Sequence, residues 1–375
     1  MYDMLVIGGG INGCAVAREA ALHGLSVLLV ERDALAAHTS SASSKLIHGG
    51  LRYLETYDFR LVREALQERA RLLRLAPALV RPVPFVLPHV HATRPAWLVR
   101  LGLLLYDTIG GRGRGVPAAR RLRASDAAFQ APFARTLPGF VYYDAMVDDA
   151  ALTRAYAADA AAVGAQLREH VAVTEATRSE AWQVRLSSGQ SITARIIVNA
   201  AGPWAADVTE TLGGDRPALR LVKGSHLTVT RLYEGDHAYL LQQPDRRVVF
   251  AFPWAGETAI GTTDVPVDAP ADPQISGEET AYLLDAANRY FAQALTPADV
   301  TGSWSGIRAL HDDGAAEART VTRDYHLELD RSAAPLLTIV GGKITTARAL
   351  AEDVLAKLGW GTPVSRKRPL PSPLP

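Results

Sequence analysis

Residues 4–13 read Met-Leu-Val-Ile-Gly-Gly-Gly-Ile-Asn-Gly, an apolar run that ends in a glycine-rich turn. An alanine-rich stretch with helical character follows as far as His23, and a second apolar run covers residues 25–30. This order predicts a strand, a glycine turn, a helix and a second strand, which is the smallest unit of a parallel α/β sheet. We therefore expect a Rossmann-type α/β fold at the start of the chain.

The glycines of this turn have the spacing of a dinucleotide-binding fingerprint. Gly8 allows a tight turn, Gly10 lets the backbone approach a pyrophosphate, and Gly13 lets the helix pack closely on the strand. Glu31 closes the second strand, where a carboxylate would bind a ribose hydroxyl of adenosine. An ordinary glycine turn of an α/β protein is the less favoured alternative. The fingerprint predicts a bound dinucleotide but does not separate FAD from NAD.

Three later segments add to this prediction. Residues 39–54 combine hydroxyl side chains with His-Gly-Gly-Leu-Arg-Tyr-Leu, which suits a loop around a cofactor better than a flexible serine linker. Residues 198–204 are a strand that ends in small side chains, as expected beside the adenine half of a nucleotide. Residues 340–346 again read as strand, glycines and helix start. A second helix N-terminus would stabilise negative charge on a reduced flavin, which favours FAD over NAD.

Length and composition indicate an ordinary folded protein with room for two domains. The chain has 375 residues, of which 48% are hydrophobic and 21% charged. A single cysteine, Cys14, excludes an internal disulfide framework and indicates a reducing, cytoplasmic compartment. No secretory signal is recognised, and the longest apolar run, residues 97–109, contains Arg100 and Asp107 and is too short to span a bilayer.

Basic residues gather in one part of the chain. Between Lys45 and Arg123 there are 15 Lys/Arg against five Asp/Glu, although the net charge is only +1. Residues 59–75 have the pattern of an amphipathic helix, and residues 97–106 are apolar with arginines nearby. Both are candidates for contact with an anionic lipid surface; core-facing helices with solvated arginines are the alternative. No interleaved aromatic residues or known module support nucleic-acid binding, so we expect no nucleic-acid partner.

Together these motifs resemble the FAD-dependent glycerol-3-phosphate dehydrogenase family (aerobic, quinone-linked), within the wider D-amino-acid-oxidase-like superfamily. The resemblance is collinear over residues 1–358, and the serine-rich segment with His-Gly-Gly-Leu-Arg-Tyr-Leu is its most specific part. The matching runs are residues 7–13, 39–54, 97–107, 147–149, 198–204, 223–226, 261–264, 305–308, 322–325 and 341–346.

The resemblance implies an α/β fold with a discontinuous Rossmann-type FAD-binding domain and an inserted mixed-sheet substrate domain. We expect the first domain at residues 1–85, 145–212 and 311–360, and the second at residues 86–144 and 213–310. The pattern predicts helices over 277–295 and 345–358, and a disordered proline-rich tail over 361–375. The resemblance implies that family members usually continue into a C-terminal helical domain, and we expect this chain to lack that domain.

The implied activity is oxidation of sn-glycerol 3-phosphate, a small phosphate ester, to dihydroxyacetone phosphate, with electrons passed to membrane quinone. The implied location is cytoplasmic and peripheral on the cytoplasmic membrane. The alternatives are an oxidase that passes electrons from another small hydroxy or amino acid to oxygen, and a flavin-binding protein left inactive without the C-terminal domain.

The family motifs also imply roles for individual residues. A phosphate dianion needs guanidinium groups, and loss of a hydroxyl proton needs a base such as histidine. The catalytic residues are His226 as base, Arg308 and Lys343. The substrate-binding residues are Arg52, Tyr53, Thr262, Arg308 and Arg323. The cofactor-binding residues are Gly8, Gly10, Asn12, Gly13, Glu31, Thr39, Ser40, Ser44, Lys45, Leu46, His48, Gly49, Gly50, Ala201, Gly202, Gly342, Lys343 and Thr345. No metal site is predicted.

Overall fold

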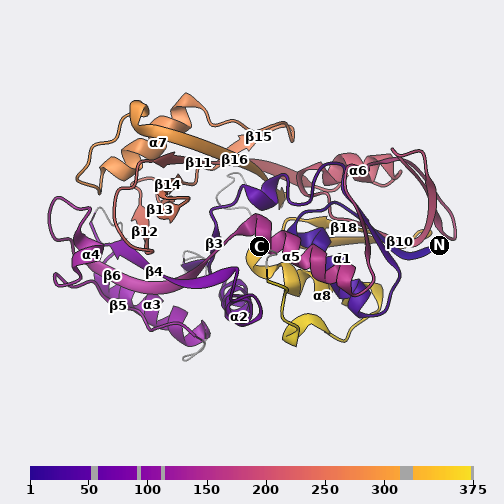
Figure 1. Ribbon diagram of the computed structural model, residues 1–375, viewed down its shortest axis with the longest axis horizontal. Helices are drawn as coiled ribbons and strands as arrows, with labels where there is room; N and C mark the ends of the chain where they lie inside the picture. The colour runs from indigo at the N-terminus through magenta and orange to yellow at the C-terminus, as the bar shows by residue number, and fades with distance from the viewer. Residues whose placement is uncertain (52–57, 91–93, 111–114, 313–323, 373–375) are drawn as a thin grey trace.

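The computed structural model describes residues 1–51, 58–90, 94–110, 115–312 and 324–372. Two mixed β-sheets lie side by side in it (Figure 1). The first sheet contains the N-terminal strand of the chain and lies on the right in Figure 1, with helices α1, α5 and α8. The second sheet lies on the left with helices α3, α4 and α7.

The first sheet has the strand order β17-β18-β10-β1-β2-β7, and a β8–β9 pair is attached to β10. Its central strands β18, β10, β1, β2 and β7 are parallel, as the fingerprint predicts, and β17, β9 and β8 run antiparallel to their neighbours. The strands are β1 (Tyr2–Ile7), β2 (Val27–Val30), β7 (Gln166–Arg168), β8 (Val173–Arg178), β9 (Trp182–Leu186), β10 (Ser191–Asn199), β17 (His326–Asp330) and β18 (Leu336–Val340).

Apolar side chains cover both faces of this sheet. Met4 and Val6 of β1 face one core cluster with α1 (Ile11–Leu22), α5 (Asp149–Ala162) and α8 (Ala347–Leu358). Leu5 and Ile7 alternate to the opposite face, where they pack with residues of β8 and β9 and with α6 (Ala205–Thr211). A strand buried on both faces reads as a continuous apolar run, which is why residues 4–7 are apolar without alternation.

The second sheet has the order β15-β11-β14-β13-β12-β4-β6-β3, with β16 paired to β11 and β5 to β6. Its pairs are antiparallel apart from the parallel β12–β4 pair. The strands are β3 (Leu46–Ile47), β4 (Val80–Pro88), β5 (Arg120–Arg121), β6 (Gly139–Val147), β11 (Leu219–Val229), β12 (Ala238–Gln242), β13 (Val248–Trp254), β14 (Glu257–Gly261), β15 (Val265–Val267) and β16 (Val300–His311).

Four further α-helices belong to the described chain. The amphipathic helix α2 (Phe59–Leu75) has the bounds that the sequence predicts, and most of its apolar side chains are buried, although Phe59 at its start is exposed. The others are α3 (Ala96–Gly110), the short α4 (Ala127–Gln130) and α7 (Gly277–Asn288). We expected α7 to continue to residue 295, but it ends at Asn288. The Asn288 side chain instead bonds both the backbone N–H and the carbonyl of Leu295 and folds the chain into a turn.

The prediction of a disordered tail is wrong for residues 361–372. This segment, which we call the C-terminal strap, crosses the helices of the first sheet. Arg368 forms an ion pair with Asp159 of α5, which also binds Arg18 of α1, and the backbone N–H of Leu370 donates to Leu75. The composition indicated disorder, but the arginines of the strap meet buried carboxylates that the tail sequence alone does not reveal.

The division into two domains remains a proposal. Strand β3 pairs with β6, and β4 pairs with β6 and β12, so both strands belong to the second sheet. We therefore place the boundary of the proposed substrate domain before Val80 rather than at residue 86, with Leu46 and Ile47 as a short excursion into it.

Candidate active site

A cavity of about 540 Å³ lies between the two sheets and is lined by residues of both. It extends from the glycine turn after β1 to the middle of β11 and β16. The predicted site residues that line it are Gly8, Gly10, Asn12, Glu31, Thr39, Ser40, Ser44, Leu46, His48, Gly49, Gly50, Ala201, Gly202, His226, Thr262, Arg308, Gly342, Lys343 and Thr345. The structure thus brings together segments that are far apart in the sequence.

The glycine turn requires glycine for reasons that the structure shows. Gly8 has φ +112°, and a Cβ there would lie 2.6 Å from the carbonyl oxygen of Ala200. A Cβ on Gly13 would overlap the carbonyl oxygen of Gly8, so α1 can approach β1 this closely only without a side chain. The N-terminal residues of α1 consequently line the cavity, where a helix N-terminus favours an anion.

Glu31 is buried at the end of β2 and braces the same turn. Its Oε2 accepts a hydrogen bond of 2.6 Å from the backbone N–H of Gly9, and its Oε1 accepts one from Asp33. Each carboxylate oxygen has two acceptor positions, so these bonds leave room for a ribose hydroxyl.

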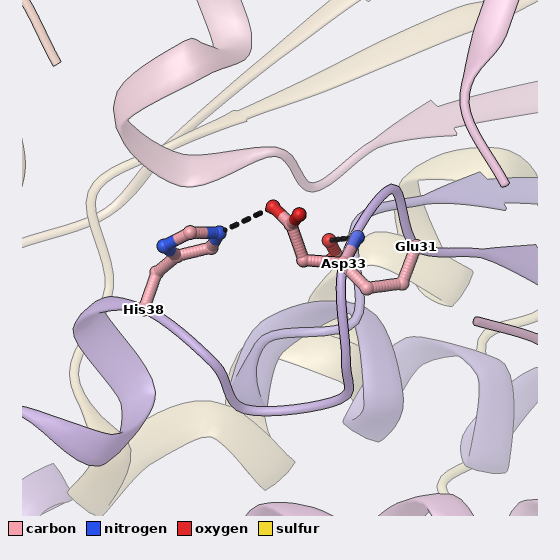
Figure 2. Close-up of side chains that lie close together, drawn as sticks. All are labelled: Glu31, Asp33 and His38. Carbon is pink, nitrogen blue, oxygen red and sulfur yellow. Dashed lines mark hydrogen bonds and ion pairs between the residues drawn. The ribbon is translucent and has the colours of Figure 1, made fainter. Parts of the chain in front are cut away.

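Glu31, Asp33 and His38 lie close enough together to consider a metal ion (Figure 2). Asp33 is, however, engaged with His38 at 2.7 Å, and Glu31 accepts from the backbone N–H of Asp33 (Figure 2). Glu31 also accepts from the backbone N–H of Gly9. Beside them Arg32 stacks over Trp204 at 4.1 Å, so the cluster forms a polar and aromatic rim of the cavity. These contacts account for all three side chains without an ion.

The serine-rich segment connects the two sheets around the cavity. Ser40 Oγ accepts from the backbone N–H of Ile11, and Thr39 Oγ1 donates to the carbonyl of Ile307 in β16. Lys45, which we predicted as a cofactor-binding residue, does not line the cavity. Its ammonium group is buried in an ion pair of 2.7 Å with Asp149 at the start of α5. This geometry supports a bracing role for Lys45 behind the loop.

His226 on β11 is 2% exposed and lies in the cavity wall. Its ring stacks on Trp304 with a centroid distance of 4.8 Å, and its Nε2 lies 2.8 Å from Ser44 Oγ. Nδ1 is buried and has no hydrogen-bond partner among the described residues. Burial, followed by the nearby charges of Arg308 and Lys45, lowers the pKa of His226 to about 3, so the imidazole is neutral at pH 7.

Arg308 on β16 presents its guanidinium group to the same cavity. Nη1 forms an ion pair of 2.9 Å with Asp264, and Nη2 donates to the carbonyl of Thr263 at 2.8 Å. A Cβ on Gly224 would overlap Nη2, so this glycine makes room for the arginine. These contacts hold the guanidinium in one orientation beside Thr262, another of the predicted substrate-binding residues.

Behind Arg308 and His226 lies a polar network that the sequence did not lead us to predict. Glu279 of α7 accepts from Ser225 and Thr263 and pairs with Lys223 at 2.9 Å. Burial alone would raise the pKa of Glu279, but these hydrogen bonds lower it to about 2. The network joins the strand of His226 to the turn of Thr262. A glutamate in a helical pattern gives no signal of such a role; in the structure Glu279 also completes a capping box with Ser276 at the start of α7.

The segment before α8 completes the cavity wall. Gly341 and Gly342 both have positive φ, and a Cβ on Gly342 would lie 2.7 Å from Asn12 Nδ2. Asn12 donates from that nitrogen to the carbonyl of Gly341, while its buried Oδ1 has no hydrogen-bond partner among the described residues. Arg52, Tyr53 and Arg323 lie outside the described residues, so their predicted roles stay predictions.

The residues present fit a flavin dinucleotide. The glycine turn offers backbone N–H groups at a helix N-terminus, Glu31 lies where the ribose is expected, and Asn12 Oδ1 is an acceptor without a partner among the described residues. At the other end of the cavity a guanidinium and a neutral imidazole stand together. This arrangement can bind an anionic alcohol and accept its hydroxyl proton.

Comparisons with known proteins agree with this geometry. A family model described as FAD dependent oxidoreductase matches residues 3–348. The chain is 49% identical over 388 residues to a glycerol-3-phosphate dehydrogenase of Pseudomonas aeruginosa, covering 99% of this chain and 75% of that protein. It is 48% identical over 368 residues to a D-erythritol 1-phosphate dehydrogenase of Brucella abortus, covering 95% and 73%. A solved glycerol-3-phosphate dehydrogenase of Bacillus halodurans complexed with FAD superimposes with a TM-score of 0.75 at 28% identity, covering 99% and 68%.

Within the described residues, no helix is long and apolar enough to cross a membrane.

Proposed function

Because the chain belongs to the FAD dependent oxidoreductase family, we propose that it oxidises sn-glycerol 3-phosphate to dihydroxyacetone phosphate. One observation carries the proposal: a single cavity joins the glycine turn to a neutral buried imidazole and an oriented guanidinium. A phosphate ester with a hydroxyl group matches these two side chains together.

The glycine turn, Glu31 and the loop of residues 39–50 would hold the cofactor. When bound, FAD supplies the acceptor for the hydrogen and the electron pair that leave C2 of the alcohol. Arg308 would hold the phosphate group in the orientation that Asp264 and Thr263 impose on its guanidinium. Arg52 and Arg323 are proposed to add to this phosphate site.

His226 is proposed to take the hydroxyl proton as C2 becomes a carbonyl carbon. The imidazole is neutral at pH 7, so it can accept a proton. A phosphate dianion beside Arg308 would offset part of the positive charge that lowers the pKa of His226. Substrate binding would therefore raise this pKa and strengthen the base when it is needed.

Anaerobic reduction tests the proposal. We expect FAD-loaded protein to lose its visible flavin absorbance on addition of sn-glycerol 3-phosphate, since the two electrons of the alcohol reduce the flavin. D-erythritol 1-phosphate belongs in the same assay, because the relative that oxidises it is almost as similar as the first one. Glycerol is the control, since it has the alcohol but lacks the phosphate that Arg308 would bind.

Each outcome has a defined meaning. A flavin that stays oxidised with every phosphate ester would contradict the proposed function. If only D-erythritol 1-phosphate bleaches the flavin, that longer phosphate ester is the substrate.

We propose quinone as the electron acceptor. Rapid reoxidation by a soluble quinone with little peroxide in air is the expected result, and stoichiometric peroxide would identify an oxidase.

We propose further that α3 contacts a lipid surface, where quinone dissolves. One side of α3 exposes four large apolar side chains: Trp97 (68%), Leu101 (45%), Leu104 (49%) and Leu105 (39%). Their spacing of four, three and one residues gives one apolar stripe along the helix, and Arg100 is exposed beside it. The apolar face of α2 is buried in the core, which leaves α3 as the better supported of the two predicted lipid contacts.

Liposome flotation checks the role of α3. We expect the wild-type protein to float with vesicles that contain anionic lipid. The double variant Leu101→Glu/Leu104→Glu should no longer float, and its FAD content should stay unchanged. Two buried leucines in lipid contribute about 3–5 kcal/mol, roughly a thousandfold in partitioning. Val364→Glu is the matched control, because Val364 is also exposed (40%) but lies on the C-terminal strap. Equal flotation of all three proteins would remove α3 as the contact.

A further inference from the structure

The inner face of α3 carries a tyrosine that contacts the cavity wall directly. Tyr106 is 1% exposed, and its hydroxyl oxygen accepts a hydrogen bond of 2.7 Å from the backbone N–H of Gly49. The same hydroxyl lies 2.8 Å and 2.9 Å from the two carboxylate oxygens of Asp144 on β6, to which it donates. A Cβ on Gly49 would lie 2.7 Å from this hydroxyl and would overlap Leu66 of α2. Glycine is therefore required for the approach.

The direction of these hydrogen bonds is set by charge. Asp144 is 1% exposed and forms an ion pair with Arg69 of α2, which also donates to the carbonyl of Tyr143. A carboxylate can only accept, so the hydroxyl proton of Tyr106 must point towards Asp144. A lone pair of the hydroxyl then faces Gly49, so the hydrogen bonds run from the Gly49 amide through Tyr106 to Asp144, where they meet the one that Arg69 donates.

Residues 48–51, which include the Gly49 that Tyr106 binds, belong to the proposed substrate site. His48, Gly49, Gly50 and Leu51 all line the cavity, and the chain continues from Leu51 directly into the Arg52-Tyr53 pair of the family motif. A displacement of this wall would change the shape of the cavity in which the substrate is proposed to bind. Small misplacements of binding groups cost much of a rate enhancement, since the reacting atoms must stay aligned.

We infer that Tyr106 is a positioning residue for the reaction: its hydroxyl, oriented by Asp144, fixes the Gly49 amide and thereby the cavity wall formed by residues 48–51. This inference deepens the proposed function and rests on it. It also means that one helix presents the apolar stripe outwards and holds the active-site wall inwards.

The test variant is Tyr106→Phe, which deletes only the hydroxyl. We expect kcat/KM for glycerol 3-phosphate to fall about tenfold or more, because the Gly49 amide loses its hydroxyl acceptor at 2.7 Å in a buried place and keeps only its contact with the Asp144 carboxylate. FAD content should stay close to wild type, because the glycine turn and Glu31 are untouched, and most of the loss should be in KM, because the displaced wall lines the proposed substrate site. Tyr156→Phe is the matched control, since Tyr156 is equally buried but lies on α5 in the first core, and it should retain wild-type kinetics.

Hydrogen exchange gives a second measurement that does not require activity. The Gly49 amide in the wild-type holoenzyme should exchange slowly, and in Tyr106→Phe it should exchange at least about tenfold faster. Unchanged kinetics together with unchanged exchange in Tyr106→Phe would overturn the inference. A variant that fails to fold leaves the decision to the wild type, where rapid exchange at Gly49 would overturn it. A wild-type protein that no phosphate ester reduces would instead refute the proposed function, and exchange would still decide the role of Tyr106.

Discussion

The Gly13→Ala variant is expected to lose FAD. A methyl group at this position would overlap the carbonyl oxygen of Gly8, which belongs to the backbone of the turn and cannot rotate away. The N-terminus of α1 must then move from β1, and its amides move from the place of the pyrophosphate. We expect FAD affinity to fall about a hundredfold or more, equivalent to ~3 kcal/mol. The ratio of flavin to protein absorbance after reconstitution measures the effect.

Gly277→Ala is the control for this variant. A Cβ on Gly277, at the start of α7, would meet no atom within 4 Å, so the variant should bind FAD like the wild type. Thermal unfolding with and without added FAD distinguishes loss of the cofactor from loss of the fold. Gly13→Ala protein that keeps a full complement of FAD would show that α1 does not hold the pyrophosphate.

The Arg308→Ala variant is expected to keep FAD but to lose its affinity for phosphate esters. Removing an oriented guanidinium takes away charge-assisted hydrogen bonds of about 1.5–3 kcal/mol each, so kcat/KM should fall at least about a hundredfold. The flavin should remain reducible by dithionite, since the glycine turn is untouched. Steady-state kinetics with glycerol 3-phosphate, together with the anaerobic titration, provide the measurement.

Three comparisons separate phosphate binding from other effects. Arg308→Lys keeps the charge without the fork and should fall between wild type and Arg308→Ala. The double variant Arg308→Ala/Asp264→Asn also removes the carboxylate that pairs with Arg308. A similar loss of kcat/KM in this double variant would assign the effect to the guanidinium group. Arg289→Ala removes an exposed arginine paired with Asp285 and should have no effect. A wild-type KM in Arg308→Ala would mean that the phosphate group of the substrate does not bind to Arg308.

The nucleotide half of the site was the easier part to predict. Gly8, Gly13 and Glu31 lie within one local βαβ unit, where spacing alone determines the neighbours. The bounds of α2 were also predictable, since they depend on the period of a local apolar pattern. The family fold and its cofactor, both expected from collinear motifs, are confirmed by the matching family model.

The supporting contacts could not be predicted, because they join residues far apart in the chain. Nothing in the sequence relates Glu279 to Ser225, or Tyr106 to Gly49; only the folded sheets bring them together. Lys45 shows the same limit, since its motif suggested the cofactor while its partner proved to be Asp149. The C-terminal strap was misjudged for a similar reason, because its arginines are ordered by carboxylates such as Asp159 and Glu352 on distant helices.

The order of strands has a consequence for how this molecule assembles. Along the described residues the backbone alternates between the sheets: β1 and β2, then β3 to β6, then β7 to β10, then β11 to β16, then β17 and β18. Neither sheet can thus be completed from one contiguous stretch, and no single cut would yield two independent halves. Assembly depends on contacts between distant parts of the chain, which slows folding. Several of the segments that connect the two sheets line the cavity. A ligand bound there would contact both sheets and stabilise their association, and its release would weaken that association.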